Sequence, residues 1–455
     1  MIDMPLIADV RGGGSRTTRV PLSLRQCVSR NVRETHRLAI QLTIGEFSRT
    51  FLDMITRDAA HRVRHLATLY PVVTVTGPRQ SGKTTLCRAV FPELPYVSLE
   101  PLDVRDHALR DPRGFLAALP KGAILDEVQR APDLPSYLHA LVDADASPGR
   151  FILTGSQQLA LSAAVSQSLA GRTGVLELYP PSWGELQRFP TAPQELFEAI
   201  WMGAYPRIFD RAIPADQWLA DYVATYVQRD VRQLLRVGDL RAFSDFVHLC
   251  AGRTAAEVNL SRLGADAGVT HNTAKAWLSV LEASYLVFRL PAWHATVRKQ
   301  VIRAPKLHFV DTGLACHLLG IREPAQLRTH PLRGALFETW VAAEVLKRNA
   351  HEGASGRLFH YREVTGLEVD LVVERGLEVQ LVEAKSGATL AGDFTAGVTR
   401  LAAEMARVDA SRSVTGWVVY GGETAQVRGG VQCVPWREIS LPEPARISSP
   451  SSVGR

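Results

Sequence analysis

Residues 77–84 read GPRQSGKT and fit the pattern G-x-x-x-x-G-K-[ST] at every fixed position. The preceding run, residues 72–76, is β-branched and apolar enough to predict a buried parallel strand, and residues 85–90 favour the first turns of a helix. Glycines in such a loop let backbone N–H groups turn toward a phosphate, and the helix N-terminus adds its positive dipole end. The sequence therefore predicts a strand, loop and helix that bind a nucleoside triphosphate.

Two side chains of this loop have specific expected roles. Lys83 is expected to reach the β- and γ-phosphates, and the hydroxyl of Thr84 to bind Mg²⁺. Lysine is scarce, with seven residues against a large excess of arginine, so Lys83 indicates a position that needs a compact ammonium charge. The predicted nucleotide-binding set is Gly77, Pro78, Arg79, Gln80, Ser81, Gly82, Lys83, Thr84, Thr85 and, from a later strand, Asp126.

Two adjacent carboxylates end a later apolar strand, predicted over residues 123–127. Asp126 is expected to hold Mg²⁺, usually through water, and Glu127 to polarise the attacking water as a general base. Packing alone does not readily explain adjacent carboxylates at the end of a buried strand. The next predicted strand, residues 150–156, ends in Thr-Gly-Ser, where Ser156 either orients the water or contacts the γ-phosphate. An ordinary strand-end turn is the alternative.

Composition narrows the class of protein. A chain of 455 residues suggests two or three domains, and 46% hydrophobic with 22% charged residues is ordinary for a globular protein. No apolar run is long enough for a transmembrane helix, and the N-terminus lacks a hydrophobic signal core, so we expect no membrane partner. Five scattered cysteines without metal-ligand spacing favour a reducing cytoplasm. The net charge of +6 is compatible with nucleic acid.

The pattern of strands and helices predicts an α/β fold. Further strands are expected over residues 96–99 and 174–178, and their alternation with helical stretches is typical of a parallel sheet with helices on both faces. Residues 196–235 read as mostly helical, broken at Gly203 and Pro206. After them the pattern becomes helical with short loops.

Residues 263–285 resemble a helix-turn-helix, and residues 286–290 could form a wing strand. The second helix opens with His271, Asn272, Thr273 and Lys275, polar residues that can reach base edges in DNA. Small helical folds of this kind also serve as packing linkers, so both interpretations stay open.

The C-terminal part carries a second group of charged residues. Glu338 falls on an amphipathic helix, Asp370 on a strand, and Glu383 and Lys385 two apart on the next strand, which places the last two on one face. This order resembles the PD-(D/E)XK nuclease core. The resemblance implies that Asp370 and Glu383 bind Mg²⁺, that Lys385 positions or activates water, and that Glu338 is the helix acid. The same fold is also used as an inert interaction module.

The motifs together resemble a family of bacterial and archaeal AAA-type ATPases with a C-terminal domain of unknown function. Besides the two strand-end motifs, the resemblance rests on Leu169-Ala170-Gly171-Arg172 and on Pro-Pro-Ser-Trp-Gly-Glu at 180–185, and it covers about residues 54–440. It implies that Arg172 contacts phosphate, either within its own subunit or from a neighbour. A structural salt bridge is the alternative for Arg172.

These interpretations divide the chain into six parts. We expect a partly disordered extension (1–53), a P-loop AAA-type core (54–190), a helical lid or linker (191–239), a winged-helix-like part (240–333), a small α/β nuclease-like domain (334–440) and a disordered tail (441–455).

The leading functional hypothesis is an enzyme that hydrolyses ATP with Mg²⁺ and couples hydrolysis to nucleic-acid binding or processing. Its predicted catalytic residues are Lys83, Glu127, Ser156 and Arg172, and its expected partners are ATP, DNA and further copies of the chain. The alternative is an ATP-switched regulatory or interaction protein, of the toxin–antitoxin kind, with an inert nuclease-like domain.

Overall fold

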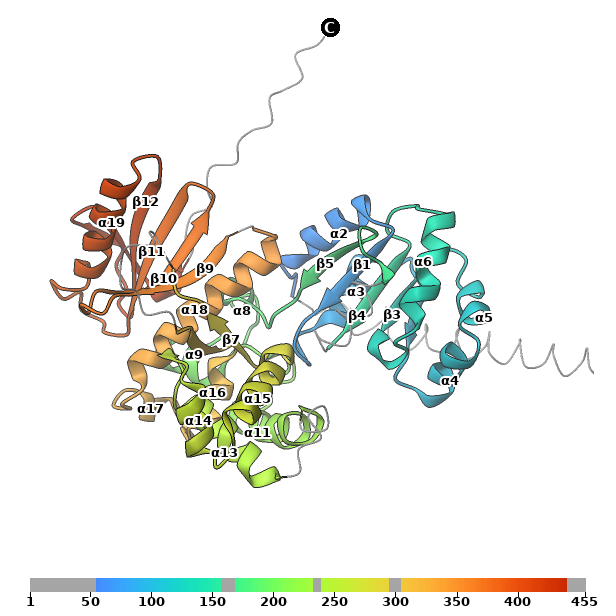
Figure 1. Cartoon of the computed structure of the whole chain (residues 1–455), viewed down its shortest axis with the longest axis horizontal. Coiled ribbons are helices and arrows are strands. Elements are labelled where there is room, and N and C mark those ends of the chain that lie inside the picture. The colour runs from blue at the N-terminus through green and yellow to red at the C-terminus, as the bar shows by residue number, and fades with distance from the viewer. Residues whose placement is uncertain (1–54, 157–167, 232–238, 294–303, 355, 440–455) are drawn as a thin grey trace, which may run out of the picture. The chain divides into compact units, whose positions relative to one another are not determined.

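The computed structural model describes residues 55–156, 168–231, 239–293, 304–354 and 356–439 (Figure 1). The described residues all belong to one compact unit that begins at Ile55. The predicted extension over residues 1–53, the tail over 441–455 and Cys27 lie outside them.

The N-terminal sheet has five parallel strands in the order β2-β3-β4-β1-β5. Their bounds are Val72–Thr76 for β1, Tyr96–Ser98 for β2, Ala123–Asp126 for β3, Phe151–Gly155 for β4 and Thr173–Glu177 for β5. Each predicted strand is confirmed to within one residue at either end. Because the strands are parallel, their carboxyl ends meet at one edge, where the loop after β1 lies.

Helices cover both faces of this sheet, as predicted. Helices α2 (Ala59–Leu69) and α3 (Lys83–Val90) pack on the face that carries Val73 and Val75 of β1. Helices α4 (Leu102–Arg110), α5 (Pro112–Ala117) and α6 (Leu134–Ala144) pack on the face that carries Val72. Sequence reasoning missed α4, because Ala108 is its single buried residue and its apolar period is therefore weak.

The helical region after the sheet is interrupted where the sequence predicts. It comprises α8 (Trp183–Leu186), α9 (Leu196–Met202), α10 (Pro206–Asp210), α11 (Ala215–Tyr222) and the π-helix η2 (Val223–Val231). Gly203 ends α9 with φ of 70°, and Pro206 is the first residue of α10. A glycine tolerates this backbone conformation and a proline suits a first helical turn, so the two residues separate the helices.

A small antiparallel sheet lies in the middle of the chain among helices. In chain order, this part consists of helix α13 (Leu240–Ala251), strand β6 (Ala256–Glu257), helices α14 (Leu260–Asp266) and α15 (His271–Ala283), and strands β7 (Val287–Leu290) and β8 (Lys306–Phe309). The sheet order is β6-β8-β7. Helices α16 (Thr312–Leu318) and α17 (Pro324–Leu327) come next.

The C-terminal part consists of a long helix, α18 (Arg333–Glu352), and a six-stranded mixed sheet in the order β13-β14-β12-β11-β10-β9. Strands β10 (Glu368–Arg375) and β11 (Glu378–Lys385), which carry the predicted Asp370 and Glu383–Lys385 positions, form an antiparallel hairpin. The other elements are β9 (Arg357–Arg362), α19 (Ala396–Val408), β12 (Ser413–Tyr420), β13 (Gln426–Arg428) and β14 (Val431–Pro435).

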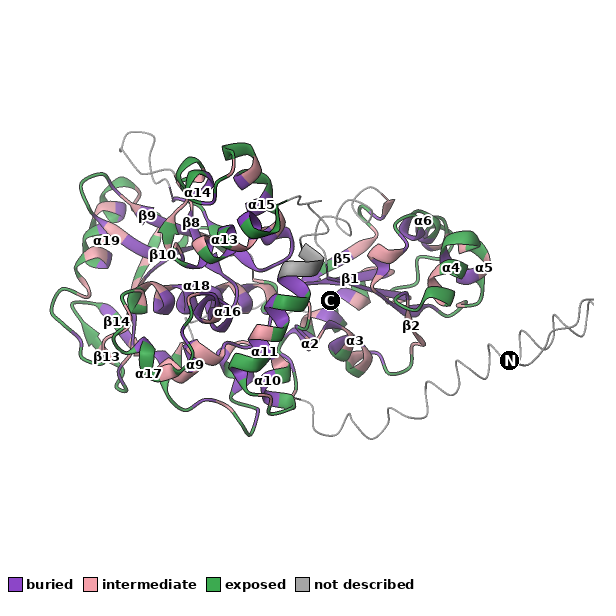
Figure 2. Ribbon diagram, turned by 90° about the horizontal axis from the view of Figure 1, so that it is seen from below, coloured by how far each residue is buried: buried purple, intermediate pink, exposed green. Residues whose placement is uncertain are grey.

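One hydrophobic core extends from α8 to the end of the C-terminal sheet. Trp183, Trp340 and Trp436 meet in it, with ring centroids 4.7–6.1 Å apart. Helix α18 runs through this core, with 12 of its 20 residues buried, and Figure 2 shows it largely in the buried colour. The middle and C-terminal parts therefore share their apolar interior.

Candidate functional site

The loop after β1 has the backbone that its glycines allow. Gly77 has φ of 143° and Gly82 φ of 94°, both in the region that favours glycine. A Cβ atom on Gly77 would collide with the carbonyl oxygen of Leu178, so the loop can pass the end of β5 only with glycine there. Gly82 then caps α3, whose first residue is Lys83. The loop thus leads directly into a helix N-terminus.

Lys83 is buried and bonded to its own loop. Its Nζ donates to the carbonyl oxygens of Gly77 at 3.0 Å and of Pro78 at 2.7 Å. Burial lowers the pKa of Lys83 to about 8, although Glu127 and Asp126 act in the opposite direction. The nearby hydroxyl of Ser81 is buried and has no hydrogen-bond partner among the described residues. A buried ammonium and an unsatisfied hydroxyl in a glycine-built loop fit a bound polyphosphate.

Asp126 lies where a side chain could hold Mg²⁺ beside Thr84. The hydroxyl of Thr84 donates to Asp126 Oδ1 at 3.0 Å. Two further hydroxyls, those of Tyr96 at 2.8 Å and of Thr154, also donate to this carboxylate. Sequence reasoning did not select Tyr96 and Thr154. The position of Thr154 near the carboxyl end of β4, beside β3, is a signal that could have found it, whereas Tyr96 is the first residue of β2 and no local signal marks it.

Glu127 directly follows β3 with φ of 57°, an uncommon conformation for a residue with a side chain. The hydroxyl of Ser156, at the end of β4, donates to Glu127 Oε2 at 3.2 Å, and the amide of Gln129 also donates to that oxygen. Ser156 is fully buried. The structure therefore brings Glu127 and Ser156 together near Asp126, and it adds Gln129, which the sequence analysis missed.

The remaining loop residues belong to the same strand-end region. Arg79 lies over the ring of Tyr226 in η2, with 5.4 Å between the guanidinium carbon and the ring centroid. Gln80 has φ of 65°, and Thr85 lies in the first turn of α3. Arg79 thus connects the loop to the helical region that the sequence predicts to be a lid or linker.

Arg172 lies at the opposite edge of the sheet, which rules out the expected contact with phosphate in its own subunit. Its carbonyl accepts the N–H of Val72, the first residue of β1, whereas the phosphate loop follows the last residue of that strand. Five strand residues span roughly 16 Å. The Arg172 side chain forms an ion pair with Asp143 of α6, and about a third of it is exposed.

The C-terminal acidic residues gather around a lysine that sequence reasoning did not consider. Lys306 of β8 is 2% exposed, and its Nζ lies 2.7 Å from Glu338, 2.7 Å from Glu368 and 3.7 Å from Asp370. Lys385, which the nuclease resemblance assigns to water, pairs with Glu383 at 2.6 Å. The ammonium group of Lys306 holds the position between the other three carboxylates.

Burial and crowding shift the titration of this cluster. Burial and the neighbouring Asp370 raise the pKa of Glu338 well above its usual range, and the same two causes raise the pKa of Glu383 to about 8. Burial alone would lower the pKa of Lys306, but Glu338, Asp370 and Glu368 together raise it. Among the described residues, no group of three or more His, Cys, Asp or Glu side chains is placed to hold a metal ion.

Three protein families match the chain. They are an AAA domain over residues 69–187, a domain of unknown function (DUF8612) over 193–325 and a domain of unknown function (DUF4143) over 333–439. Together with the parallel sheet and its glycine-built loop, the first match makes the N-terminal part an AAA-type P-loop ATPase domain. Neither of the other two matches names an activity.

Two curated proteins resemble most of the chain. Uncharacterized protein Rv2008c of Mycobacterium tuberculosis and uncharacterized protein Mb2031c of Mycobacterium bovis are each 34% identical to it over 328 residues, which cover 70% of this chain and 71% of each relative. The chain belongs to the same family as these two mycobacterial proteins.

Two solved structures align with part of the chain. The Walker-type ATPase PABY2304 of Pyrococcus abyssi aligns with a TM-score of 0.41 at 15% identity, over 58% of this chain and 96% of that one. AMPPCP-bound DnaA from Aquifex aeolicus aligns with a TM-score of 0.27 at 15% identity, over 49% and 85%.

Two further observations concern the expected environment of the protein. In the described part of the chain, no helix is both long and apolar enough to cross a membrane. The four described cysteines, at positions 87, 250, 316 and 433, are buried and free.

Proposed function

We propose that the chain binds ATP with Mg²⁺ at the loop after β1 and hydrolyses it there. The single observation that carries this proposal is the convergence of Lys83, Thr84, Asp126 and Glu127 at the carboxyl edge of one parallel sheet. Lys83 would leave the loop carbonyls and bind the β- and γ-phosphates, which satisfy its charge better than neutral carbonyls.

Each remaining residue has a role that follows from its contacts. Thr84 and Asp126 would hold Mg²⁺, which neutralises charge that develops on the phosphates when it is bound. Glu127 would accept the proton of the attacking water, and Ser156 and Gln129 keep its carboxylate in one orientation. The contact of Ser156 with Glu127 favours an orienting role for Ser156 over an ordinary strand-end turn.

The test separates binding from turnover. Lys83→Ala should abolish binding of a non-hydrolysable ATP analogue in calorimetry, because the buried site then lacks its cation. Glu127→Gln should bind the analogue normally and lose about 10²-fold or more in the hydrolysis rate, because only proton transfer is removed. A Glu127→Gln variant that hydrolyses ATP at the parent rate would show that Glu127 is not the base.

The ion pair of Arg172 with Asp143 supports its structural alternative, and the position of Arg172 leaves a contact with nucleotide open only between subunits. We propose that it contacts the nucleotide of a neighbouring copy, since its partly exposed side chain is remote from its own phosphate loop. Mixing Arg172→Ala subunits with Glu127→Gln subunits should then restore part of the hydrolysis. A monomer in sedimentation with ATP, and no recovery on mixing, would remove this role.

We also propose that ATP turnover is coupled to DNA through α15. The order α13-β6-α14-α15-β7-β8 supports a winged helix, and Ala274, Leu278 and Leu281 of α15 are buried while His271, Asn272 and Lys275 are exposed. Helix α15 therefore packs on one face and presents polar residues on the other.

DNA binding can be tested with one variant and a control from the same part of the chain. Lys275→Glu should weaken binding of labelled duplex or single-stranded DNA by about tenfold, because it replaces a phosphate-binding charge with a repulsive one. Arg241→Glu makes the same charge change on α13. Equal losses in both variants, or ATP turnover that does not respond to DNA, would contradict the proposal.

The position of Lys306 supports a second proposed function, in which the chain is an ATP-switched interaction protein and its nuclease-like domain is inert. The buried ammonium of Lys306 lies beside Asp370, one of the two expected metal ligands, and between Glu338 and Glu368, so a cation already occupies this position. The parent protein should therefore cleave neither DNA nor RNA with Mg²⁺ or Mn²⁺. Cleavage that disappears in both Asp370→Ala and Lys385→Ala would show instead that the domain is an active nuclease.

A further inference from the structure

Arg57, just before α2, is a buried cation that the proposed hydrolysis does not use. It is 8% exposed and donates in three directions: to Glu185 Oε1 at 2.9 Å, to the carbonyl of Ser81 at 2.8 Å and to the carbonyl of Tyr179 at 2.8 Å. One of these acceptors belongs to the phosphate loop. The other two belong to α8 and to the segment that leads into it.

The contact with Ser81 bears directly on phosphate binding. In a trans peptide unit the C=O and N–H groups point in opposite directions, so holding the carbonyl of Ser81 also fixes the N–H of Gly82. That N–H precedes Lys83 and is one of the donors that a phosphate loop uses. A guanidinium nitrogen of Arg57 also lies 3.4 Å from where a Cβ of Gly82 would be, so Arg57 lies against the loop.

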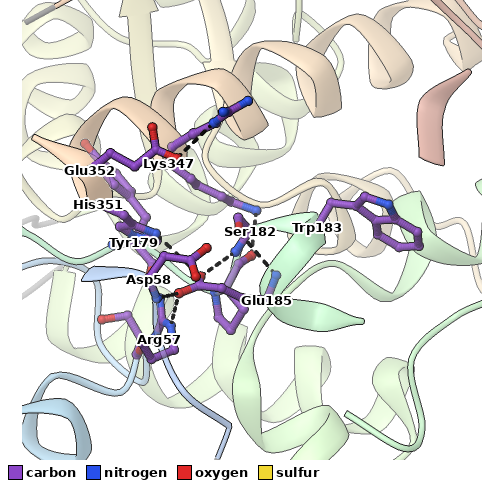
Figure 3. A network of polar contacts seen from close by, with 12 residues as sticks. Arg57, Asp58, Tyr179, Ser182, Trp183, Glu185, Lys347, His351 and Glu352 are labelled. Carbon is purple, nitrogen blue, oxygen red and sulfur yellow. Dashed lines mark hydrogen bonds and ion pairs between the residues drawn. The ribbon is translucent and has the colours of Figure 1, made fainter. Parts of the chain in front are cut away.

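Glu185 connects Arg57 to α18. Its Oε1 accepts the N–H of Asp58 at 2.6 Å, its Oε2 accepts the N–H of Ser182 at 2.8 Å, and Oε2 lies 3.4 Å from Nδ1 of His351 in the last turn of α18. Figure 3 shows Glu185 with Arg57 and His351 around it. Burial alone would raise the pKa of Glu185, but His351 and Arg57 hold it well below its usual range. Glu185 is therefore a fully buried, ionised carboxylate that contacts both Arg57 and His351.

Other contacts attach the same end of α18 to the segment around α8. Tyr179 donates its N–H to Nε2 of His351 at 3.1 Å, and Glu344 accepts the N–H of Trp183 at 2.5 Å. Lys347 donates to the carbonyl of Pro181 at 3.3 Å. Thirteen residues before His351, Glu338 of the same helix pairs with Lys306, about 20 Å away along the helix axis. Helix α18 thus extends from the residues bonded to Arg57 and Glu185 to the carboxylates around Lys306.

We propose that Arg57 is a positioning residue for the phosphate loop and that, through Glu185, it ties that loop to α18. The inference rests on the proposed nucleotide binding at this loop. Arg57 itself contacts no reacting atom. It holds the peptide unit between Ser81 and Gly82, so nucleotide binding that orders this unit would also order the network and the C-terminal end of α18.

The main test compares Arg→Lys variants of two arginines, one in the segment before α2 and one that binds to that segment. Arg57→Lys keeps the charge beside Glu185 but loses the planar group that reaches the two carbonyls. Arg188→Lys is the control, because Arg188 binds Thr56 and Asp58 beside Arg57 without touching the phosphate loop. We expect Arg57→Lys to bind a fluorescent ATP analogue about tenfold more weakly, the equivalent of one charge-assisted hydrogen bond, and Arg188→Lys to bind it normally.

Hydrogen exchange tests the link to α18. Nucleotide should slow exchange of the backbone amides of residues 344–352 in the parent and in Arg188→Lys, but not in Arg57→Lys. Glu185→Gln should bind nucleotide nearly as well as the parent but should lose the protection of residues 344–352. If Arg57→Lys does not fold, Glu185→Gln alone tests whether the phosphate loop is linked to α18. Protection that persists in Glu185→Gln would overturn the link.

The outcomes separate this inference from the proposed function. A parent protein that binds no nucleotide would refute both. A parent that binds and hydrolyses ATP while Arg57→Lys binds equally tightly would leave the hydrolysis intact and overturn the role of Arg57.

Discussion

At the scale of single residues, Lys83 and Lys306 are two buried lysines with opposite environments. Lys83 has neutral carbonyls as its direct partners, and burial lowers its pKa to about 8. Lys306 lies among carboxylates that raise its pKa. The ammonium of Lys83 lacks a carboxylate as a direct partner among the described residues, so an anion could bind to it. The ammonium of Lys306 is already paired with carboxylates.

The pKa of Lys83 makes nucleotide affinity dependent on pH. Above pH 8 the empty site loses the proton of Lys83, and a bound polyphosphate restores it, so binding takes up about half a proton at pH 8. The dissociation constant should rise by about tenfold between pH 7 and pH 9. Calorimetry in two buffers of different ionisation enthalpy measures the proton uptake, with Lys121→Ala, an exposed lysine, as the control. Affinity that stays constant over this range would contradict the assignment.

Removing Lys306 should destabilise the protein in a pH-dependent way. Lys306→Met leaves Glu338, Glu368 and Asp370 without their cation and should cost about 3–5 kcal/mol at pH 8. The folded-state pKa of Glu338 is already raised and would rise further without Lys306, so the folded variant binds a proton more tightly than the unfolded chain does. The loss of folding free energy should therefore become smaller as the pH falls toward 5.

The matched control for Lys306 is Lys385→Met. The ammonium of Lys385 is one-third exposed and pairs with Glu383, so its removal should cost at most about 1 kcal/mol. Chemical denaturation of both variants at pH 5 and pH 8 compares their free energies of unfolding. Equal losses at the two pH values would argue against charge compensation by Lys306.

At the scale of elements, the turn between α9 and α10 depends on one glycine. Gly203 has φ of 70° and ψ of −154°, and the carboxylate of Asp311 occupies the space that a Cβ atom would need. Asp311 in turn caps α16 through the N–H of Leu314 at 3.0 Å and accepts the N–H of Ala204 at 2.7 Å. The turn and the start of α16 are therefore built on one buried carboxylate.

Gly203→Ala should accordingly destabilise the protein by about 3 kcal/mol or more, because the methyl group displaces a buried, hydrogen-bonded carboxylate. Gly268→Ala is the control, since Gly268 also has φ of 70° but no atom within 4 Å of its Cβ position, and only the backbone cost of about 1–2 kcal/mol applies. Thermal unfolding compares the two. Similar losses would mean that backbone conformation alone requires the glycine at 203.

At the scale of the whole molecule, the shared core joins the parts that the sequence divides. Phe309 of β8, Phe337 of α18 and Val382 of β11 belong to one apolar cluster, although the predicted boundary falls at residue 333. The nucleotide-binding sheet has separate clusters on its two faces. The predicted domain limits remain predictions, and the packing indicates that the two C-terminal parts fold together.

A fragment of residues 333–439 should therefore not fold alone. It would expose the side chains of Phe337, Trp340, Val382 and Trp436, each of which contributes about 1.5–3 kcal/mol by burial. We expect aggregation, or unfolding without a cooperative transition, and recovery of a soluble complex on co-expression with residues 55–332. A monomeric fragment with a cooperative melting transition would contradict this expectation.

Local patterns in the sequence suffice for the strands and for the phosphate loop. The β-branched run of β1, the paired acids after β3 and the glycines at 77 and 82 specify their own conformations, because propensity and steric freedom act within a few residues. The E-x-K pair on β11 likewise follows from the two-residue repeat of a strand. These features were predictable because each depends on neighbours in the chain.

The sequence alone therefore determined an AAA-type ATPase core, its loop residues and the acidic group near the C-terminus. Only the tertiary structure decided that Lys306, 32 residues before Glu338, compensates that group, and that Arg57 reaches Glu185 and Ser81. It also decided that Arg172 lies at the edge of the sheet away from the loop. The physical reason is that an ion pair between buried groups depends on which surfaces meet after folding, and no local periodicity records that choice.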